Sequence, residues 1–505
     1  MLITQLNACM MGRDYERPPV NAPLEFKEVK GWKQAEPRDN VLLGKWWEIY
    51  NDPKLNELEE QVEKANQSVL QAVAQYHQAV HLVLSVEAQL FPTGTGTGTF
   101  NRFVAASGTS LAPSGVRNLI SNGLAMTWQP DLWGNVRRQI ESDKEAAQAS
   151  AATMQALQLS LQSTLAVDYF SLKMLDAEKV LLDQTVASYS RTLEITKNRY
   201  AVGVAAKSDV VQAEAQTESV RAQSINLGIQ RAQYEHAIAV IIGKAPQELT
   251  LAQAPLDILP PPIPVNLPSE LLERRPDIAA SERQIAAANA LIGAAKAAYY
   301  PNLTLGLSDG YQSGFLNLNT LYTLAKNYWA LGPASGSLSI FDGGAKNAQY
   351  KMAIDNFEAA VAGYRQTVLT AFQQVEDNLA ALRILEQEAG VQSKAVDDAN
   401  EAVVLTINQY KAGTVSYINV MTAQTTALTN QVTAVQLQGQ RLASSVQLIT
   451  ALGGGWDLHK LPTPDQIGDQ IKWSDYLIIP GVDQGKSENA LSPPFRDFLQ
   501  MHFLP

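Results

Sequence analysis

One internal duplication constrains the fold of this chain more than any other feature of its sequence. A segment from about residue 68 to 243 is matched by another from about residue 277 to 453, and matched positions stay 209 or 210 residues apart (277 minus 68, 344 minus 134). The matched positions are Ser68 with Asp277, Pro92 with Pro301, Gly134 with Gly344, Gly203 with Gly413 and Gly243 with Gly453. A period of this length is too long for a solenoid of short repeats, so the pattern indicates two copies of one supersecondary unit.

Each copy contains a long stretch without proline, which predicts long helices. Proline removes a backbone donor and breaks helix interiors, and it is absent from Asp131 to Ala245 and from Ala334 to Leu461. Gly203 and Gly413, near the middle of these stretches, are expected to end one helix in a left-handed cap. Each stretch is therefore interpreted as two helices folded back on one another. The helix predicted from Asn135 to Asn198 would be roughly 95 Å long at 1.5 Å per residue.

Apolar residues recur at every third or fourth position along these stretches, as they do in coiled coils. The recurring positions are Met154, Leu157, Leu161, Leu165 and Tyr169 in the first copy, and Tyr364, Val368, Phe372, Val375 and Leu379 in the second. The last helix has an unusual polar face, because Arg441 is the only charged residue between Ala412 and Trp456. An uncharged polar face is typical of a packed helical wall or of a water-filled lumen.

Alternation of apolar and polar residues before each helical pair predicts two β-hairpins, at about residues 93–130 and 302–342. The alternating segments are 93–99, 124–128, 302–308 and 337–340. For an isolated strand, such a row is more often the core-facing side of a soluble sheet. Here each hairpin lies at the far end of very long helices with no other sequence nearby to cover it, which favours a lipid-facing row. The predicted row is Leu124, Met126, Trp128, Leu303, Leu305, Leu307, Leu338 and Ile340.

Four strands are too few to close a barrel in a membrane. Membrane barrels need at least about eight strands, and unpaired backbone groups at an open edge cost several kcal/mol each in lipid. If the hairpins enter a membrane, two or more chains must complete one barrel.

Several motifs resemble the outer-membrane efflux factors of the TolC-like family, in particular the lipoprotein branch that serves tripartite RND-type efflux systems. The resemblance covers roughly Trp46 to Asp457, and its two most specific parts are the runs 271–278 (Leu-Leu-Glu-Arg-Arg-Pro-Asp-Ile) and 341–344 (Phe-Asp-Gly-Gly). The other matching segments are 46–55, 90–92, 128–134, 267–270 and 300–301.

The resemblance implies a homotrimeric α+β membrane protein, with a twelve-stranded outer-membrane barrel continued by a tunnel of long coiled helices across the periplasm. It implies an outer-membrane channel, not an enzyme, that passively exports small molecules delivered by an inner-membrane pump and a periplasmic adaptor. The turns between the paired helices would lie at the periplasmic end and meet the adaptor. The residues implied for this docking are Val202, Gly203, Val204, Ala412, Gly413 and Thr414.

The same family likeness implies a pore constriction close to these turns. Its candidates are Arg199, Tyr200, Lys207, Asp209, Tyr410, Lys411, Tyr417 and Asn419. Asp209 is matched by Asn419 at the shift of 210, so only one copy supplies a carboxylate ring. Such a ring would attract cations. The alternative is that Asp209 caps the returning helix through its side-chain oxygen, and both roles are compatible.

The N-terminal run Leu6-Asn7-Ala8-Cys9 resembles a lipobox, in which the cysteine is acylated. Cys9 is the only cysteine, which excludes a disulfide within one chain. Only eight residues precede it and none is Lys or Arg, so a signal peptide of the usual kind is missing. We expect a lipid anchor at Cys9, with a free thiol as the alternative.

The expected organisation is an anchor and extended tether (1–45), a first repeat (46–245), a proline-rich linker (246–268), a second repeat (269–456) and a C-terminal tail near the equatorial region (457–505). The formal charge of −11 argues against nucleic acid as a partner. His77 and His81 have the spacing of a metal pair, but no acidic residue follows His77, so neither a metal nor a cofactor is expected. Two alternatives remain: a soluble coiled-coil scaffold, and the outer-membrane component of a type I protein secretion system.

Overall fold

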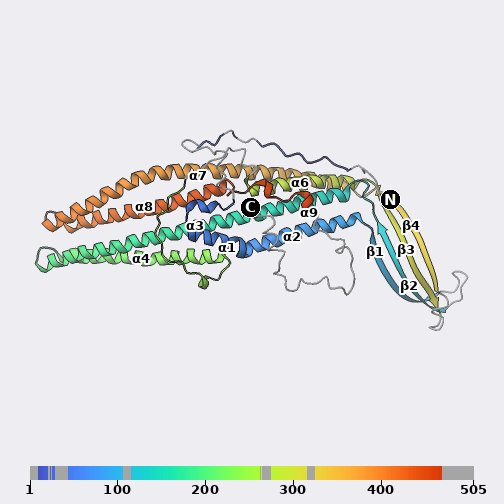
Figure 1. Ribbon diagram of the computed structural model, residues 1–505, viewed down its shortest axis with the longest axis horizontal. Helices are drawn as coiled ribbons and strands as arrows, with labels where there is room; N and C mark the ends of the chain where they lie inside the picture. The colour runs from blue at the N-terminus through green and yellow to red at the C-terminus, as the bar shows by residue number, and fades with distance from the viewer. Residues whose placement is uncertain are drawn as a thin grey trace.

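The computed structural model describes residues 10–20, 23, 25–28, 44–105, 115–261, 263, 274–315 and 325–468 of the chain. Cys9 and the tail from residue 469 lie outside the described residues, so the predictions made for them stay predictions. The molecule is elongated: long helices extend over most of its length, and one curved sheet lies at one end (Figure 1).

The first copy consists of two short helices, a β-hairpin and a pair of long helices. Its elements are η2 (Trp46–Tyr50), α1 (Pro53–Ala65), α2 (Gln67–Glu87), η3 (Ala88–Leu90), β1 (Thr93–Ala105), β2 (Gly115–Trp128), α3 (Asn135–Ala201), α4 (Lys207–Ile241) and η4 (Pro246–Glu248). The second copy repeats this order from α2 onward. Its elements are α6 (Pro276–Ala297), β3 (Asn302–Phe315), β4 (Ala325–Ser337), α7 (Ala345–Ala412), α8 (Tyr417–Ala451), η7 (Leu458–Lys460) and α9 (Pro464–Gly468).

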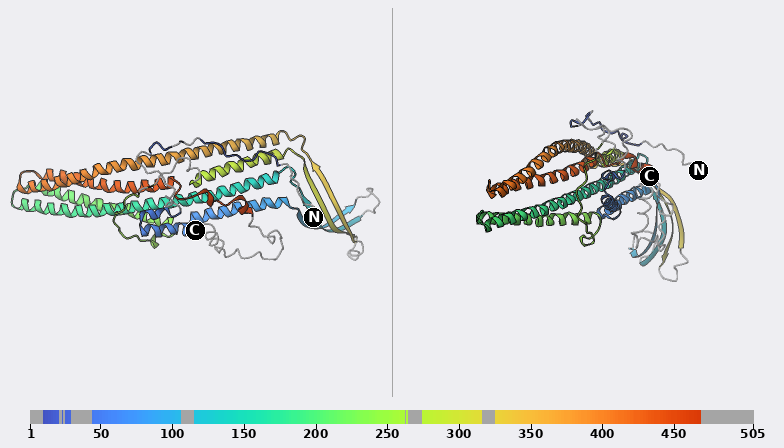
Figure 2. Two further views of the ribbon diagram at one scale, coloured as in Figure 1. Left: turned by 45° about the horizontal axis from the view of Figure 1, so that its top comes forward. Right: turned by 60° about the vertical axis from the view of Figure 1, so that its left-hand side comes forward.

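The element order confirms the duplication and both helical pairs. α3 and α7 are 67 and 68 residues long, and α4 and α8 are 35 residues each. Gly203 and Gly413 have φ values of 78° and 80°, the left-handed conformation that only glycine adopts without strain. The two helical pairs run side by side to neighbouring tips (Figure 2). No helix of the described chain combines the length and hydropathy that a membrane span requires.

The four strands form one antiparallel sheet in the order β1-β2-β3-β4. Met126 pairs with Gly94 on one side and with Leu307 on the other, and Leu307 pairs in turn with Leu331. Paired residues share a face of the sheet, so these four positions lie in one row across it. Both β1 and β4 are edge strands within the chain.

The prediction for the fourth strand was wrong. β4 ends at Ser337, so Leu338 and Ile340 lie beyond the sheet, in the segment that leads to α7. The true strand contains Gly332 and Pro333, next to an irregularity in the β3–β4 register. Proline is tolerated there because it lies at a bulge on an edge strand. The other predicted strands were too short, since β1, β2 and β3 are 13, 14 and 14 residues long.

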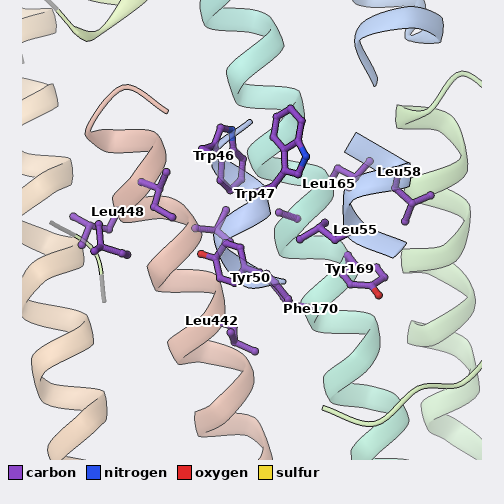
Figure 3. Packing of buried hydrophobic residues seen from close by; sticks show 14 of the residues in the cluster. Trp46, Trp47, Tyr50, Leu55, Leu58, Leu165, Tyr169, Phe170, Leu442 and Leu448 are labelled. Carbon is purple, nitrogen blue, oxygen red and sulfur yellow. The ribbon is translucent and has the colours of Figure 1, made fainter. Parts of the chain in front are cut away.

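The largest buried cluster, the central core, lies where η2 packs between α3 and α8 and where α1 packs against α3 (Figure 3). The ring of Tyr50 lies 4.9 Å from that of Phe170, centroid to centroid, and its hydroxyl is 2.8 Å from Ser445 Oγ. Asp52 caps α1 by accepting hydrogen bonds from the backbone of Lys54 and Leu55. These contacts fix the start of the first copy against both long helical pairs.

The chain before the first copy runs as an extended strap along the helices. Arg138 donates to the backbone oxygen of Met11 at 3.0 Å, close to the junction of α3 with the sheet. Farther along, Tyr15 donates to Glu282 of α6 at 2.7 Å, and the Phe26 ring packs on Phe372 of α7. The strap therefore joins α3 of the first copy to α6 and α7 of the second.

The linker between the copies is held against the helices in the same region. Arg231 of α4 donates to Asp176 of α3 and to the backbone oxygen of Leu251, both at 2.7 Å. Gln438 of α8 then donates to the backbone oxygen of Leu256 at 2.8 Å. Beyond this level, the two helical pairs continue to their tips.

Candidate functional site

Two turns with the same backbone geometry form the free ends of the helical pairs. We call residues 202–206, between α3 and α4, the first tip, and residues 413–416, between α7 and α8, the second tip. In the first tip the amide of Val204 donates to Arg199 O at 2.9 Å, and in the second the amide of Thr414 donates to Gln409 O at 3.0 Å. Matched glycines thus produce matched turns, and any difference in function between the tips must come from side chains.

Arg199, in the last turn of α3, connects the two tips. Its Nη1 donates to the backbone oxygens of Tyr410 and Lys411 at 2.7 and 2.9 Å, at the C-terminal end of α7. The guanidinium carbon lies 4.7 Å from the centroid of the Tyr410 ring. The last carbonyls of a helix carry partial negative charge, so the cation is stabilised there.

Tyr410 and Tyr417 lie in a small core inside the tips rather than on an open surface. Both side chains are buried, and their rings meet edge to face at 5.9 Å. Ala213 of α4 and Val420 of α8 belong to the same cluster. Burial above all, together with the neighbouring Tyr189, Tyr410 and Asp209, raises the pKa of Tyr417 to about 12. Because burial within one chain can only increase in an assembly, neither ring borders a pore in this conformation.

The polar candidates lie on the outside of the tips. Asp209 is half-buried in the first turn of α4, while Tyr200, Lys207 and Asn419 are exposed. The helix begins after Ala206, which makes no side-chain cap, and the Asp209 carboxylate accepts no hydrogen bond within the described part of the chain. The capping alternative for Asp209 is therefore not supported by a bond, although a carboxylate in a first helical turn is favourable.

The surfaces of the two tips differ in polarity. Val202 and Val204 of the first tip are 74% and 62% exposed. The matching positions around the second tip hold Ala412 and Thr414, which are also exposed but smaller or polar. The first tip therefore has an exposed apolar surface at these two positions, whereas the second tip has smaller or polar side chains there.

The sheet has one apolar face, and it includes most of the predicted row. Leu124, Met126 and Trp128 on β2 share this face with Leu303, Leu305 and Leu307 on β3. The same face carries residues that the sequence prediction missed: Phe100, Val104, Val116, Trp329 and Leu331, all exposed. The same alternation of apolar and polar residues could have identified them, because it continues beyond the segments that were predicted as strands. Asp309 also lies on this face, paired with Leu124 and Trp329.

The opposite face is mostly small and polar. On β1 it carries the threonines that alternate with glycine, followed by Asn101 and the exposed Phe103, and Thr93 donates to the backbone oxygen of Thr127 at 3.2 Å. Farther along, the hydroxyls of Thr99 and Ser121 are 2.6 Å apart. One face of the sheet is therefore suited to lipid and the other to water.

Among the residues that the structure describes, no three histidine, cysteine or acidic side chains gather as metal ligands. His77 and His81 lie on α2. The pKa of His77 is lowered mainly by burial and also by the charge of the nearby His81.

Comparison with known proteins gives one consistent result. The sequence profile of the family described as outer membrane efflux protein matches residues 57–244 and 267–454, one match for each copy. The chain is 30% identical over 476 residues to the probable efflux pump outer membrane protein SepC of Pseudomonas putida, covering 90% of this chain and 96% of that protein. It is 27% identical over 447 residues to the probable outer membrane lipoprotein SilC of Salmonella typhimurium, covering 88% and 95%.

A solved structure shows the same architecture. The outer-membrane channel OprN superposes with a TM-score of 0.81 at 27% identity, covering 89% of this chain and all of that one.

Proposed function

The chain belongs to the outer membrane efflux protein family, and from this premise we propose that three copies of it close one passive conduit across the outer membrane and extend it as a helical tunnel. The family resemblance, the fold class, the outer-membrane location and the role as an outer-membrane efflux channel, all predicted from the motifs, are confirmed by these relatives. The alternative of a soluble coiled-coil scaffold is therefore wrong.

The observation that carries the assembly of several copies is the four-stranded sheet with two free edges and one apolar face. A sheet of this kind exposes unpaired backbone groups at β1 and β4, which lipid does not tolerate. Pairing β4 of one copy with β1 of the next removes both edges. Two copies would already supply the minimum of about eight strands for a closed membrane barrel, and three copies, the number that the family resemblance implies, supply twelve. The apolar face then contacts lipid and the threonine face lines the lumen.

The helical pairs form the wall of the tunnel below the sheet, and their tips form its far end. The tips dock the periplasmic adaptor, and the exposed Val202 and Val204 supply apolar contact at the first tip. Asp209, Lys207, Tyr200 and Asn419 lie at the same end and border the aperture. The conduit itself performs no reaction, so substrate reaches it from an inner-membrane pump through the adaptor.

The exported compounds are small molecules whose selection depends on the pump. The lining threonines and serines offer hydrogen bonds but little shape or charge selectivity. A lipid anchor at Cys9 fits the strap, because Met11 already lies beside Trp133, where the helices meet the sheet.

One experiment tests the conduit directly. The full-length protein is extracted from membranes in detergent, its protein mass is measured by light scattering, and the same sample is reconstituted in a planar bilayer. We expect a mass of three chains and discrete single-channel currents. A monomeric mass, or a trimer that never conducts, would overturn the proposal.

A further inference from the structure

The strap ends on α7 with a pattern of residue types that also occurs at the start of the first copy. We call residues 26–28 (Phe-Lys-Glu), the last residues of the strap that the structure describes, the strap end. The first copy has Tyr-Asn-Asp at residues 50–52, so both segments place an aromatic residue two positions before a carboxylate. Phe26 and Tyr50 are both buried and both belong to the central core. One pattern is therefore used twice at the same core.

The two carboxylates are bound by cations at matched positions of the two longest helices. Asp52 accepts a hydrogen bond from Lys173 Nζ of α3 at 2.8 Å. Glu28 accepts one from Arg383 Nη2 of α7 at 2.5 Å. A shift of 210 residues, the shift of the duplication, takes Lys173 to Arg383. α3 and α7 therefore each bind a carboxylate of the N-terminal chain at the same position of the duplicated unit.

The site on α7 has one further feature, which suits an extended segment. Both carboxylate oxygens of Glu376 accept hydrogen bonds from the strap end, from the amides of Lys27 and Glu28 at 2.6 and 3.0 Å. An extended chain offers its amides no partner of its own, so the partner must come from elsewhere. The matched residue on α3 is Ala166, and there the amides at the start of α1 are capped by Asp52 itself. Glu376 therefore enables α7 to bind an extended segment where α3 binds the start of a helix.

The ion pair on α7 is more exposed than its counterpart on α3. The side chains of Lys173 and Asp52 are 10% and 7% exposed, whereas those of Arg383 and Glu28 are 37% and 23% exposed. Ion pairs that water reaches are weaker and are screened by salt. Conditions that break the contact of the strap end can therefore leave the Asp52 pair intact.

The beginning of the strap is held much more firmly than its end. Gly12 lies so close to α6 that an added Cβ would come within 2.7 Å of Gly293 Cα. The Arg138 side chain is 2% exposed and donates to the backbone oxygen of Met11 at 3.0 Å. The strap therefore has a buried attachment at Arg138 and a partly exposed one at Arg383.

We propose that α7 carries a docking site for the strap end, built on the recognition that holds the start of the first copy on α3, and that the docked strap end is a releasable brace between α7 and the first copy. While it is docked, the strap joins α7 to α3 through one continuous segment. After release, the principal helix neighbours of α7 are α6 and α8 of its own copy, and the strap stays attached at Arg138. All of these contacts lie within a single chain, so the brace does not depend on the proposed assembly of three copies.

Hydrogen exchange, measured by mass spectrometry on the full-length protein in detergent, tests the release of the strap end. The amides of Lys27 and Glu28 are protected only while they donate to Glu376. Raising the salt from about 0.1 M to about 1 M shortens the screening length from about 10 Å to about 3 Å. Exchange at residues 26–28 should then rise several-fold. Exchange at Met11, whose amide donates to the backbone oxygen of Trp133, should stay the same.

A reversal of charge tests the recognition itself. Arg383→Glu should release the strap end at low salt, and adding Glu28→Arg to it should restore protection because the pair is re-formed with its charges exchanged. Lys394→Glu makes the same change of charge at an exposed position of α7 and is the matched control, which should keep the wild-type exchange. Arg383 is partly exposed, and circular dichroism checks that each variant is folded.

The same data test the brace. On release, exchange along α7 between Tyr364 and Glu376 should rise, while exchange along α3 stays the same. Wild-type protection of residues 26–28 in Arg383→Glu, or at high salt, would overturn release. Failure of Glu28→Arg to restore protection in Arg383→Glu would overturn the ion-pair recognition. Unchanged exchange along α7 in a variant whose strap end is released would overturn the brace. Each of these results leaves the mass and the conductance of the assembly to be judged separately.

Discussion

The guanidinium of Arg199 donates to the backbone oxygen of Tyr410 at 2.7 Å and lies over the ring of the same residue. A side chain at the end of α3 therefore joins the first tip to the end of α7 at the second tip. Parting the tips would break these bonds. Arg199 is therefore positioned to hold the aperture end of each chain together.

Replacing Arg199 with Ala should raise the resting conductance of the reconstituted channel. If loss of these charged hydrogen bonds lowers the free energy of opening by about 2 kcal/mol, the open fraction of a mostly closed channel rises roughly 30-fold. Single-channel recording measures this fraction. Arg191→Ala removes the same charge from an exposed position on α3 and should leave the conductance unchanged. Equal leakage from both variants would contradict a specific role for Arg199.

Removing the Asp209 carboxylate should weaken the preference of the channel for cations. Three carboxylates around one axis concentrate cations at the aperture, and Asp209→Ala abolishes that ring. The duplication offers the reciprocal change, Asn419→Asp, which should strengthen cation preference by adding a second ring. Reversal potentials in asymmetric salt measure both effects. If the reversal potential stays at the wild-type value in the two variants, Asp209 does not face the permeation path.

Asp52→Ala should strongly destabilise the protein. Asp52 accepts from Lys173 Nζ at 2.8 Å and from the Tyr169 hydroxyl at 2.9 Å, besides capping α1. Burial alone would raise its pKa, but the bonds from Lys173 and Tyr169 outweigh burial and hold that pKa below its usual value. Losing one partner of a buried pair costs about 3–5 kcal/mol. Denaturant unfolding in detergent, followed by circular dichroism, measures the loss.

The control for Asp52 is Glu60, which forms an exposed ion pair with Lys45 at the surface of the same helix. Glu60→Ala should change the free energy of unfolding by less than about 1 kcal/mol. A similar loss in both variants would show that the burial of the Asp52 pair adds nothing.

Glu59 should make the protein less stable as the pH rises. Its side chain is fully buried in α1, and neither carboxyl oxygen has a hydrogen-bond partner among the described residues. Burial raises the pKa of Glu59 well above its usual value. The folded chain therefore binds this proton more tightly than the unfolded chain does. Its contribution is fully present below the unfolded pKa of about 4.3 and is lost as the pH rises through the folded value.

Glu59→Gln should remove this pH dependence. The variant should melt higher than the wild type at pH 8, and the difference should shrink as the pH falls toward 4. Glu57→Gln, on an exposed position of the same helix, is the matched control and should not alter the profile. A wild-type melting temperature that is the same at pH 5 and pH 8 would argue that Glu59 is solvated.

A lysine on the apolar face of the sheet should block insertion, whereas one on the threonine face should not. Leu124→Lys places a cation against lipid, at a cost of about 2–4 kcal/mol near the bilayer midplane. Thr97→Lys lies on the opposite face of the neighbouring strand, where it would meet water. We expect little Leu124→Lys protein in outer-membrane fractions. Thr97→Lys should insert normally and shift selectivity toward anions. Equal recovery of both would reverse our assignment of the two faces.

The helical part of the fold could be predicted from the sequence because its signals are local. Gly203 and Gly413 mark the helix ends within a few residues, and the predicted end of α3 at Asn198 is three residues from the observed Ala201. The fourth strand could not be located in this way. Pro333 and Gly332 are typical of loops, and only the pairing with β3 shows that β4 tolerates them at its irregular register.

The candidate site was predicted only in part. Whether a residue on a helix is buried or borders a pore depends on which other elements pack against it, and a local pattern does not show this. Tyr410 and Tyr417 were expected at a constriction, yet they lie inside the tips because α4 covers them through Ala213. The Asp52–Lys173 pair spans 121 residues of sequence and leaves no local pattern. The roles assigned to Asp209 and Asn419 stay predictions until selectivity is measured.

Far more residues are buried in α3 than in α7, and this difference has a genetic consequence. A damaging substitution in the buried face of α3 prevents its own chain from folding, so normal chains in the same cell still assemble with one another and the defect is recessive. A damaging substitution on the exposed face of α7 leaves the chain folded and able to join the assembly. Since only one in eight trimers is free of the altered chain when both kinds are equally abundant, such an allele would be dominant.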